Sequence, residues 1–329
     1  MKIVKANVLW IYLYVFCLIL TGINAYSKNV PEQIQVLFIG NSFTRNNGTI
    51  ELFKNIAFTA GFQVNAEGFL REGGSVEKYI HNDSCWKVVR SRNWDYLIIQ
   101  DYQSYYGDTL GVFPPGLLEA NIAFQDSIKK INPCAKIIYV AGWDKQAGLK
   151  NYSSTDTIIR LIPRIMVNIR YLNNQPGVHN IIAPVGLAWL RCLQRNRNIR
   201  LYIITDHRHP ARRGTYLYAI VIFSVIFRQN PDKSLYYNGI SDSDAHYLCK
   251  LGFDVVKDTL NYTNLKSHCL RFFRIGNFLV ADPGYSHYEW YINNVPYKGS
   301  YGFIFSKFDP ACTYSVVATN KKGCKIRSL

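Results

Sequence analysis

Two short segments that lie far apart in the sequence contain the residue types an acyl-transfer enzyme needs. In the first, residues 36–44, an apolar strand-like run ends at a small turn that presents Ser42. In the second, Asp206 and His209 are three residues apart in a turn. A serine hydroxyl becomes a nucleophile at neutral pH when a base accepts its proton, and a carboxylate orients an imidazole base. We therefore predict Ser42 as the nucleophile, His209 as the base and Asp206 as the orienting acid.

Each of these residues also has an ordinary structural interpretation. A serine directly after a strand often caps the following helix. Asp206 would suit a capped turn that leaves the histidine in solvent. His207 is a second candidate base, but its adjacency to Asp206 points the two side chains apart in an extended chain.

Ester cleavage also needs donors for the negative charge that develops on the carbonyl oxygen. The backbone N–H groups of Ser42 and of Gly73, in the turn Gly73-Gly74-Ser75, are two candidates. A side-chain amide would supply the third. Gln103, which follows a predicted strand, is our choice, and Gln100 is the alternative. Both glutamines also suit ordinary polar positions at a strand end.

Strand-like and helix-like segments alternate over most of the chain. Strands are predicted at 35–39, 62–70, 96–99, 136–140 and 181–185, with another from 201, and helices at 50–59, from 76, and at 117–130, 155–173, 215–227 and 245–256. This alternation predicts a parallel sheet with helices on both faces. Ligands of such sheets bind beyond the carboxyl ends of the strands, where Ser42, Gln103 and the Gly73 turn are expected.

These motifs resemble the SGNH, or GDSL-type, hydrolase superfamily of esterases. The nucleophile block reads Gly40-Asn41-Ser42, followed by Phe43-Thr44 as in a bacterial branch with Gly-Asn-Ser-Phe-Thr. Asp206 to Pro210 match the family's Asp-x-x-His-Pro block, and Gly73 fits the glycine block. The third block, Gly-x-Asn-Asp in the family, is replaced by Tyr102-Gln103-Ser104.

The resemblance covers about residues 34 to 260. It implies a flavodoxin-like three-layer α/β/α sandwich with a parallel sheet. It also implies ester hydrolysis without a metal or a cofactor, with Gln103 in the place of the family's oxyanion-binding asparagine.

The residue pattern of the chain changes after about Thr263. Aromatic-rich alternating runs separated by turn residues occupy residues 264–329. They predict a small β appendage, loosely similar to an immunoglobulin-like module, with Trp290 and Tyr314 in its core.

The N-terminal residues have the pattern of a signal peptide. Lys2 and Lys5 precede an apolar run from Val8 to Leu20, and a small residue, Ala25, suits cleavage. We predict that residues 1–25 are removed and that the protein is exported to the periplasm, the cell surface or the medium. The hydrolase domain then spans 26–263. The alternative is an uncleaved membrane anchor, for which the run is short.

Seven cysteines remain after Cys17 is removed with the signal peptide: Cys85, Cys134, Cys192, Cys249, Cys269, Cys312 and Cys324. We predict a disulfide between Cys312 and Cys324, which are close in sequence in an exported protein. The odd number leaves at least one thiol unpaired. No Cys-x-x-Cys spacing is present, so a structural zinc is not expected.

The formal net charge is +16 and the pI about 9.4, which favours anionic partners or simply keeps the protein soluble. Charge alone predicts no specific nucleic-acid partner, and the oligomeric state is left open. The leading hypothesis is an exported serine esterase acting on an O-acetylated carbohydrate. Trp143, Tyr105 and Tyr106 would either stack on sugar rings or pack in the core. The alternatives are a lipid or thioester hydrolase, and a surface glycan-binding protein on a degenerate hydrolase fold.

Overall fold

The computed structural model describes residues 33–107, 111–147, 157–176, 178, 180–196, 198–234, 236–237, 239–265, 270–300 and 302–328. The predicted signal peptide and Cys269 lie outside these ranges. Within them, no helix combines the length and the apolar character needed to cross a membrane.

A five-stranded sheet forms the centre of the larger part of the chain. Its order is β2-β1-β3-β4-β5, and every neighbouring pair is parallel. The strands are β1 (Ile34–Gly40), β2 (Val64–Leu70), β3 (Tyr96–Ile99), β4 (Lys136–Val140) and β5 (Ile181–Ala183). Residues 36–39 of β1 are fully buried, as expected for a strand covered on both faces. The predicted parallel sheet is confirmed.

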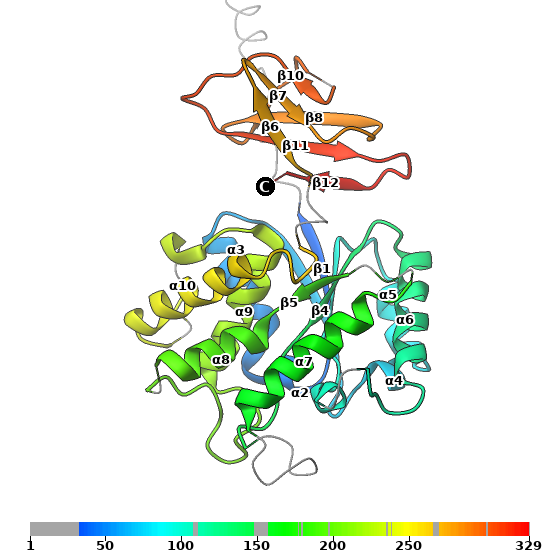
Figure 1. Ribbon diagram of the computed structural model, residues 1–329, viewed down its shortest axis with the longest axis vertical. Helices are drawn as coiled ribbons and strands as arrows, with labels where there is room; N and C mark the ends of the chain where they lie inside the picture. Colours follow the sequence, from blue (N-terminus) through cyan, green and yellow to red (C-terminus); the bar gives the residue numbers. More distant parts are fainter. Residues whose placement is uncertain are drawn as a thin grey trace, which may run out of the picture. The chain divides into compact units, whose positions relative to one another are not determined.

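Helices cover both faces of this sheet. Figure 1 shows the strands between a group formed by α3, α8, α9 and α10 and a second group formed by α4, α5 and α6. The bounds are α2 (Ser42–Arg45), α3 (Thr49–Thr59), α4 (Val76–Tyr79), α5 (Asp83–Val89), α6 (Leu117–Ile131), α7 (Ile158–Asn173), α8 (Val185–Arg195), α9 (Arg212–Phe227) and α10 (Asp242–Asp258), with 3-10 turns η1 (Asn46–Gly48), η2 (Gln103–Tyr106) and η3 (Pro231–Ser234).

Every residue of helix α9 from Gly214 to Ile226 is buried. The helix packs against α3 and α10, so apolar side chains are needed all round it rather than on one stripe. The sequence-based interpretation of this run as a buried helix is confirmed.

Two predictions near the end of the sheet are wrong. Residue 185, placed at the end of the fifth strand, begins helix α8 instead. The strand predicted from Leu201 reduces to a single bridge between Tyr202 and Pro210.

The C-terminal strands form two small antiparallel sheets, β10-β7-β6 and β12-β11-β8-β9. The strands are β6 (Phe272–Ile275), β7 (Phe278–Ala281), β8 (His287–Ile292), β9 (Val295–Pro296), β10 (Ile304–Phe305), β11 (Tyr314–Thr319) and β12 (Lys325–Arg327). Trp290 is fully buried in the core of this appendage, while Tyr314 is only partly buried and lies against Phe305. The predicted β appendage is confirmed, whereas its boundary at residue 263 stays a prediction.

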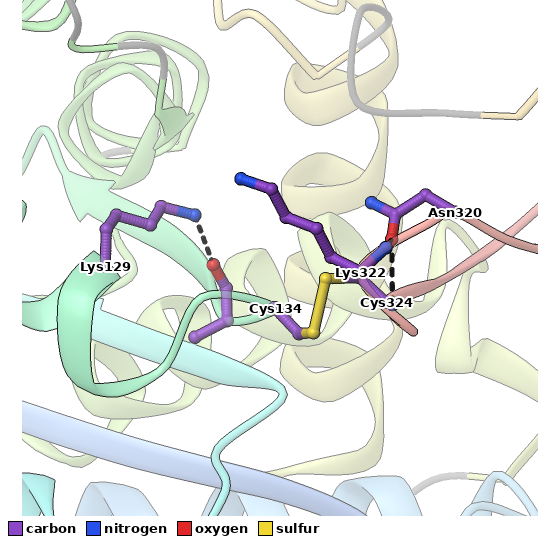
Figure 2. The surroundings of a disulfide bond; sticks show 6 residues. Lys129, Cys134, Asn320, Lys322 and Cys324 are labelled. Atoms are coloured by element: carbon purple, nitrogen blue, oxygen red, sulfur yellow. Dashed lines mark hydrogen bonds between the residues drawn. A yellow bond between two sulfur atoms is a disulfide. The ribbon is translucent and has the colours of Figure 1, made fainter.

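A disulfide joins Cys134, between α6 and β4, to Cys324, in the turn between β11 and β12 (Figure 2). The predicted Cys312–Cys324 pair is therefore wrong, and Cys312 is free. The reason is that β11 separates these two cysteines. Its six residues span roughly 20 Å, whereas the Cα atoms of the bonded pair are 4.9 Å apart.

Candidate active site

Ser42 is the first residue of α2, immediately beyond the carboxyl end of β1. Asn41 caps this short helix: its Oδ1 accepts a hydrogen bond from the N–H of Phe43 at 3.1 Å. The amide nitrogen of the same side chain donates to the carbonyl oxygen of Gly74, also at 3.1 Å. Asn41 therefore shapes the turn that carries the serine and ties it to the glycine turn after β2.

Asp206 organises the turn that carries the histidine. Its Oδ1 accepts the backbone N–H groups of Arg208 at 2.9 Å and His209 at 3.0 Å. Between Asp206 and Arg208, the chain passes through a left-handed conformation at His207, where φ is 49°. Partial burial would raise the pKa of Asp206, but the hydrogen bonds from the His209 ring and from the two N–H groups outweigh it, so the pKa is lowered.

The two turns bring Ser42, His209 and Asp206 together. Ser42 Oγ lies 2.9 Å from His209 Nε2, and His209 Nδ1 lies 2.5 Å from Asp206 Oδ2. A carboxylate at Nδ1 favours the tautomer that carries its proton there, which leaves Nε2 free to accept the serine proton. The hydroxyl, the imidazole and the carboxylate therefore form one continuous chain.

The side chain of His207, the alternative base, lies against Gln146. Its Nδ1 lies 3.3 Å from Oε1 of the Gln146 side chain, and the residue is exposed. The structure thus brings His209, not His207, to Ser42.

Two backbone donors are available near the serine. Within the described residues, no hydrogen-bond acceptor faces the N–H of Ser42 or of Gly73. Gly73 adopts φ +56°, a conformation that favours glycine and that lets the turn bend after β2. These two N–H groups are the ones that the sequence predicted as oxyanion donors.

The side chain of Gln103, the predicted third donor, is hydrogen-bonded to backbone groups. It is 2% exposed, and its amide nitrogen donates to the carbonyl oxygens of Asp101 at 3.0 Å and Val140 at 3.2 Å. Its Oε1 accepts the N–H of Gly142 at 2.7 Å. Both amide hydrogens are engaged, so Gln103 braces the loops after β3 and β4. The structure does not support its predicted oxyanion role.

Gln100, the alternative donor, supports the serine turn instead. Its Oε1 accepts the N–H of Asn41 and the hydroxyl of Thr44, each at 3.1 Å. Its amide nitrogen donates to the Asp101 carbonyl at 2.6 Å. The side chain is 2% exposed, and it holds the turn rather than a ligand.

Most of the aromatic residues expected to stack on sugars belong to the core. Trp143 is 1% exposed and is stacked between Phe43 and Trp189. Its indole N–H donates to the carbonyl of Arg208 at 3.0 Å, which supports the histidine turn. Tyr106 is fully buried, and only Tyr105 keeps partial exposure.

Sequence reasoning missed Arg208, which precedes the histidine. Its Nε lies 2.9 Å from Oδ1 of Asp144, a carboxylate with no exposed surface. Its guanidinium carbon lies 5.5 Å from the ring centre of Phe43 and 5.0 Å from that of Tyr102. Burial alone would lower the pKa of Arg208, but the attraction of Asp144 prevails and raises it. No local spacing marks this pair, because Asp144 comes from the loop after β4.

Comparison of the sequence with models of protein families and with curated proteins gives no match. Among solved structures, a DUF4886 family protein from Bacteroides uniformis is similar at TM-score 0.58 and 16% identity, over 69% of this chain and 95% of that one. The acetyl xylan esterase AlAXEase aligns at TM-score 0.44 and 18% identity, over 59% and 100%. A catalytic mutant of Axe2, an acetylxylan esterase from Geobacillus stearothermophilus, aligns at 0.43 and 11%, over 59% and 93%.

At these identities a likeness shows the fold alone. The Bacteroides uniformis structure and the sheet order β2-β1-β3-β4-β5 confirm the predicted fold class. The described domain is an α/β/α sandwich around a five-stranded parallel sheet.

Proposed function

We propose that this protein is a serine hydrolase that cleaves ester bonds. The observation that carries the proposal is the contact of Ser42 Oγ with His209 Nε2 at 2.9 Å, backed by Asp206 on the other ring nitrogen at 2.5 Å. These groups come from two turns that are remote in sequence. The Ser42 side chain also lies at the carboxyl edge of a parallel sheet, where ligands of such folds bind.

The reaction follows from the positions of these groups. His209 Nε2 takes the proton of Ser42 as its oxygen attacks the ester carbonyl carbon. The resulting oxyanion is stabilised by the N–H groups of Ser42 and Gly73. His209 then protonates the departing alcohol, which leaves an acyl-serine. Water, deprotonated by the same imidazole, attacks the acyl group, releases the carboxylic acid and restores the serine.

The finer proposal is an exported enzyme that removes acetyl groups from a carbohydrate. The signal-peptide pattern of residues 1–25 supports export, and the accessible histidine, with 23% of its side-chain surface exposed, suits a bulky substrate. The burial of Trp143 and Tyr106 leaves Tyr105 as the one of the three aromatics that could still contact a sugar. A lipid or thioester hydrolase is therefore the enzyme alternative, and aryl esters of graded acyl length distinguish the two.

The proposal is tested with the wild type and the Ser42→Ala variant on p-nitrophenyl acetate. The variant should fold normally and lose about a thousandfold or more in kcat, because no other group replaces the nucleophile. Ser91→Ala, on an exposed hydroxyl that bonds only the Val88 carbonyl, is the matched control and should keep full activity.

A fluorophosphonate probe gives a second, independent measurement. Peptide mass spectrometry should place the label on Ser42 in the wild type. Unchanged turnover in Ser42→Ala, or an unlabelled Ser42 in folded protein, would refute the hydrolase and favour the third hypothesis, a glycan-binding protein on a degenerate fold.

A further inference from the structure

We propose that Arg208 is a further catalytic residue of this site, whose guanidinium stabilises the negative charge that develops on the ester carbonyl oxygen. It would take the place of the amide side chain that Gln103 and Gln100 do not supply. This inference rests on the proposed function.

The first support is the position of the cation. Arg208 directly precedes His209, and both side chains lie against the ring of Phe43, the residue after the nucleophile. Its guanidinium also lies over Tyr102, in the turn that follows β3. Arg208 therefore extends from the histidine turn to the point where a side-chain oxyanion donor was predicted.

The second support is that the guanidinium is held rigidly on one side. Nε lies 2.9 Å from Asp144 Oδ1, an ion-pair distance without a hydrogen bond, and Nη2 donates to Ser104 Oγ at 3.2 Å and to Asp144 Oδ2 at 3.4 Å. Ser104 in turn donates a short hydrogen bond to the same carboxylate. A donor group fixed before the reaction stabilises transition-state charge without reorganising.

The third support is how the charges of this pair are distributed. The Asp144 side chain has no exposed surface, whereas 20% of the Arg208 side chain is exposed. Part of the Arg208 side chain is therefore accessible, whereas the carboxylate of Asp144 is not. A buried ion pair is weak evidence for stability, since burial of both charges offsets much of their attraction. A functional role therefore explains better than stability why this ion pair lies beside His209.

The test compares Arg208→Met with Arg213→Met on a small neutral ester. Arg213 pairs with Asp244 through Nε at 2.5 Å, outside the site, and serves as the matched control. We expect Arg208→Met to lower kcat about 100-fold while KM changes less than about threefold, as for loss of an oxyanion donor. The control should keep wild-type kinetics. In an Arg208→Ala variant, added methylguanidinium should restore part of kcat in a concentration-dependent manner.

A second variant is needed if Arg208→Met unfolds at a much lower temperature than the wild type. Arg208→Lys keeps the charge and the pairing with Asp144. It should retain about tenfold more activity than Arg208→Met.

The outcomes separate this inference from the hydrolase proposal. If fluorophosphonate labels Ser42 but Arg208→Met keeps wild-type kcat, the inference about Arg208 alone is wrong. It is also wrong if the loss is confined to KM for esters with anionic acyl groups, since the cation would then bind substrate only. Loss of kcat that guanidinium does not rescue would mark a structural role and overturn it as well. An unlabelled Ser42 in the wild type would instead reject the hydrolase itself.

Discussion

Asp206 uses its two oxygens for different tasks. Oδ1 fixes the backbone of its own turn, and Oδ2 meets the imidazole of His209. The same carboxylate thus shapes the turn and contacts the imidazole, although only two residues lie between Asp206 and His209.

We predict that Asp206→Asn lowers kcat on an aryl ester by about 10²- to 10⁴-fold, the range seen when triad acids are replaced. The amide oxygen can still accept the backbone N–H groups, but the NH₂ group would face Nδ1–H and favour the other tautomer. The melting temperature should fall only slightly. A variant within tenfold of the wild type would contradict the orienting role.

The pH dependence follows from the lowered pKa of Asp206. Its folded-state value lies below the ordinary 3.8, so the carboxylate is ionised at neutral pH. Its contribution to stability is complete above that ordinary value and is lost as the pH falls through the folded-state value. The free energy of unfolding of the wild type, relative to that of Asp206→Ser, should therefore stay constant from neutral pH down to about pH 5 and fall at more acidic pH, as measured by urea denaturation.

At this scale the short sequence motifs predicted which side chains meet in the fold. Ser42, Asp206 and His209 stand next to turn residues that fix their geometry locally. Gln103 and Arg208 have long side chains, and their partners depend on which loops meet in the folded protein. Arg208 and Asp144 are 64 residues apart, so no local pattern connects them.

At the level of elements, the four longer strands were predicted nearly in place, because β1, β3 and β4 are short apolar runs and β2 alternates, all bounded by turn residues. The end of β5 and the start of α8 were missed. The sequence from Ile181 to Leu190 is almost continuously apolar, and periodicity cannot mark a boundary inside such a run. What fixes the helix is a tertiary contact: Gly186 packs onto the backbone of Gly142.

That contact gives a prediction for the element. A Cβ at position 186 would lie 2.0 Å from the carbonyl oxygen of Gly142, so Gly186→Ala must displace α8 or the loop after β4. We expect a loss of about 1–3 kcal/mol in the free energy of unfolding, measured by urea denaturation.

Gly302→Ala is the control, since its new Cβ would have only one neighbour, at 4.0 Å. The same loop contains Asp144, so Gly186→Ala should also lower kcat. A variant as stable as the control would show that the backbone adjusts freely there.

For the molecule as a whole, the chief correction is the disulfide. Local spacing favoured Cys312 with Cys324, whereas the bonded cysteines are 190 residues apart. Because the bonded cysteines lie in segments so remote in sequence, no local spacing predicts the pairing. Cys134 precedes the amino end of β4, so the covalent link lies at the opposite edge of the sheet from Ser42, which follows the carboxyl end of β1.

We predict that a Cys134→Ser, Cys324→Ser double variant is less stable than the oxidised wild type by about 2–4 kcal/mol, since the bond restricts the unfolded chain. Differential scanning calorimetry with and without dithiothreitol measures this. Reductant should lower the wild type's transition to that of the double variant and leave the double variant unchanged. The prediction would be contradicted if reductant left the transition temperature of the wild type unchanged. It would also be contradicted if the folded double variant lost esterase activity.

The bond has one more consequence for the covalent structure of the molecule. The polypeptide passes from α10 to β6 only once, yet Cys134 and Cys324 provide a second covalent route between the same two parts. A protease that cut the connecting segment would break the chain without dividing the molecule. The two resulting peptides would stay covalently joined until an external thiol reduced the disulfide.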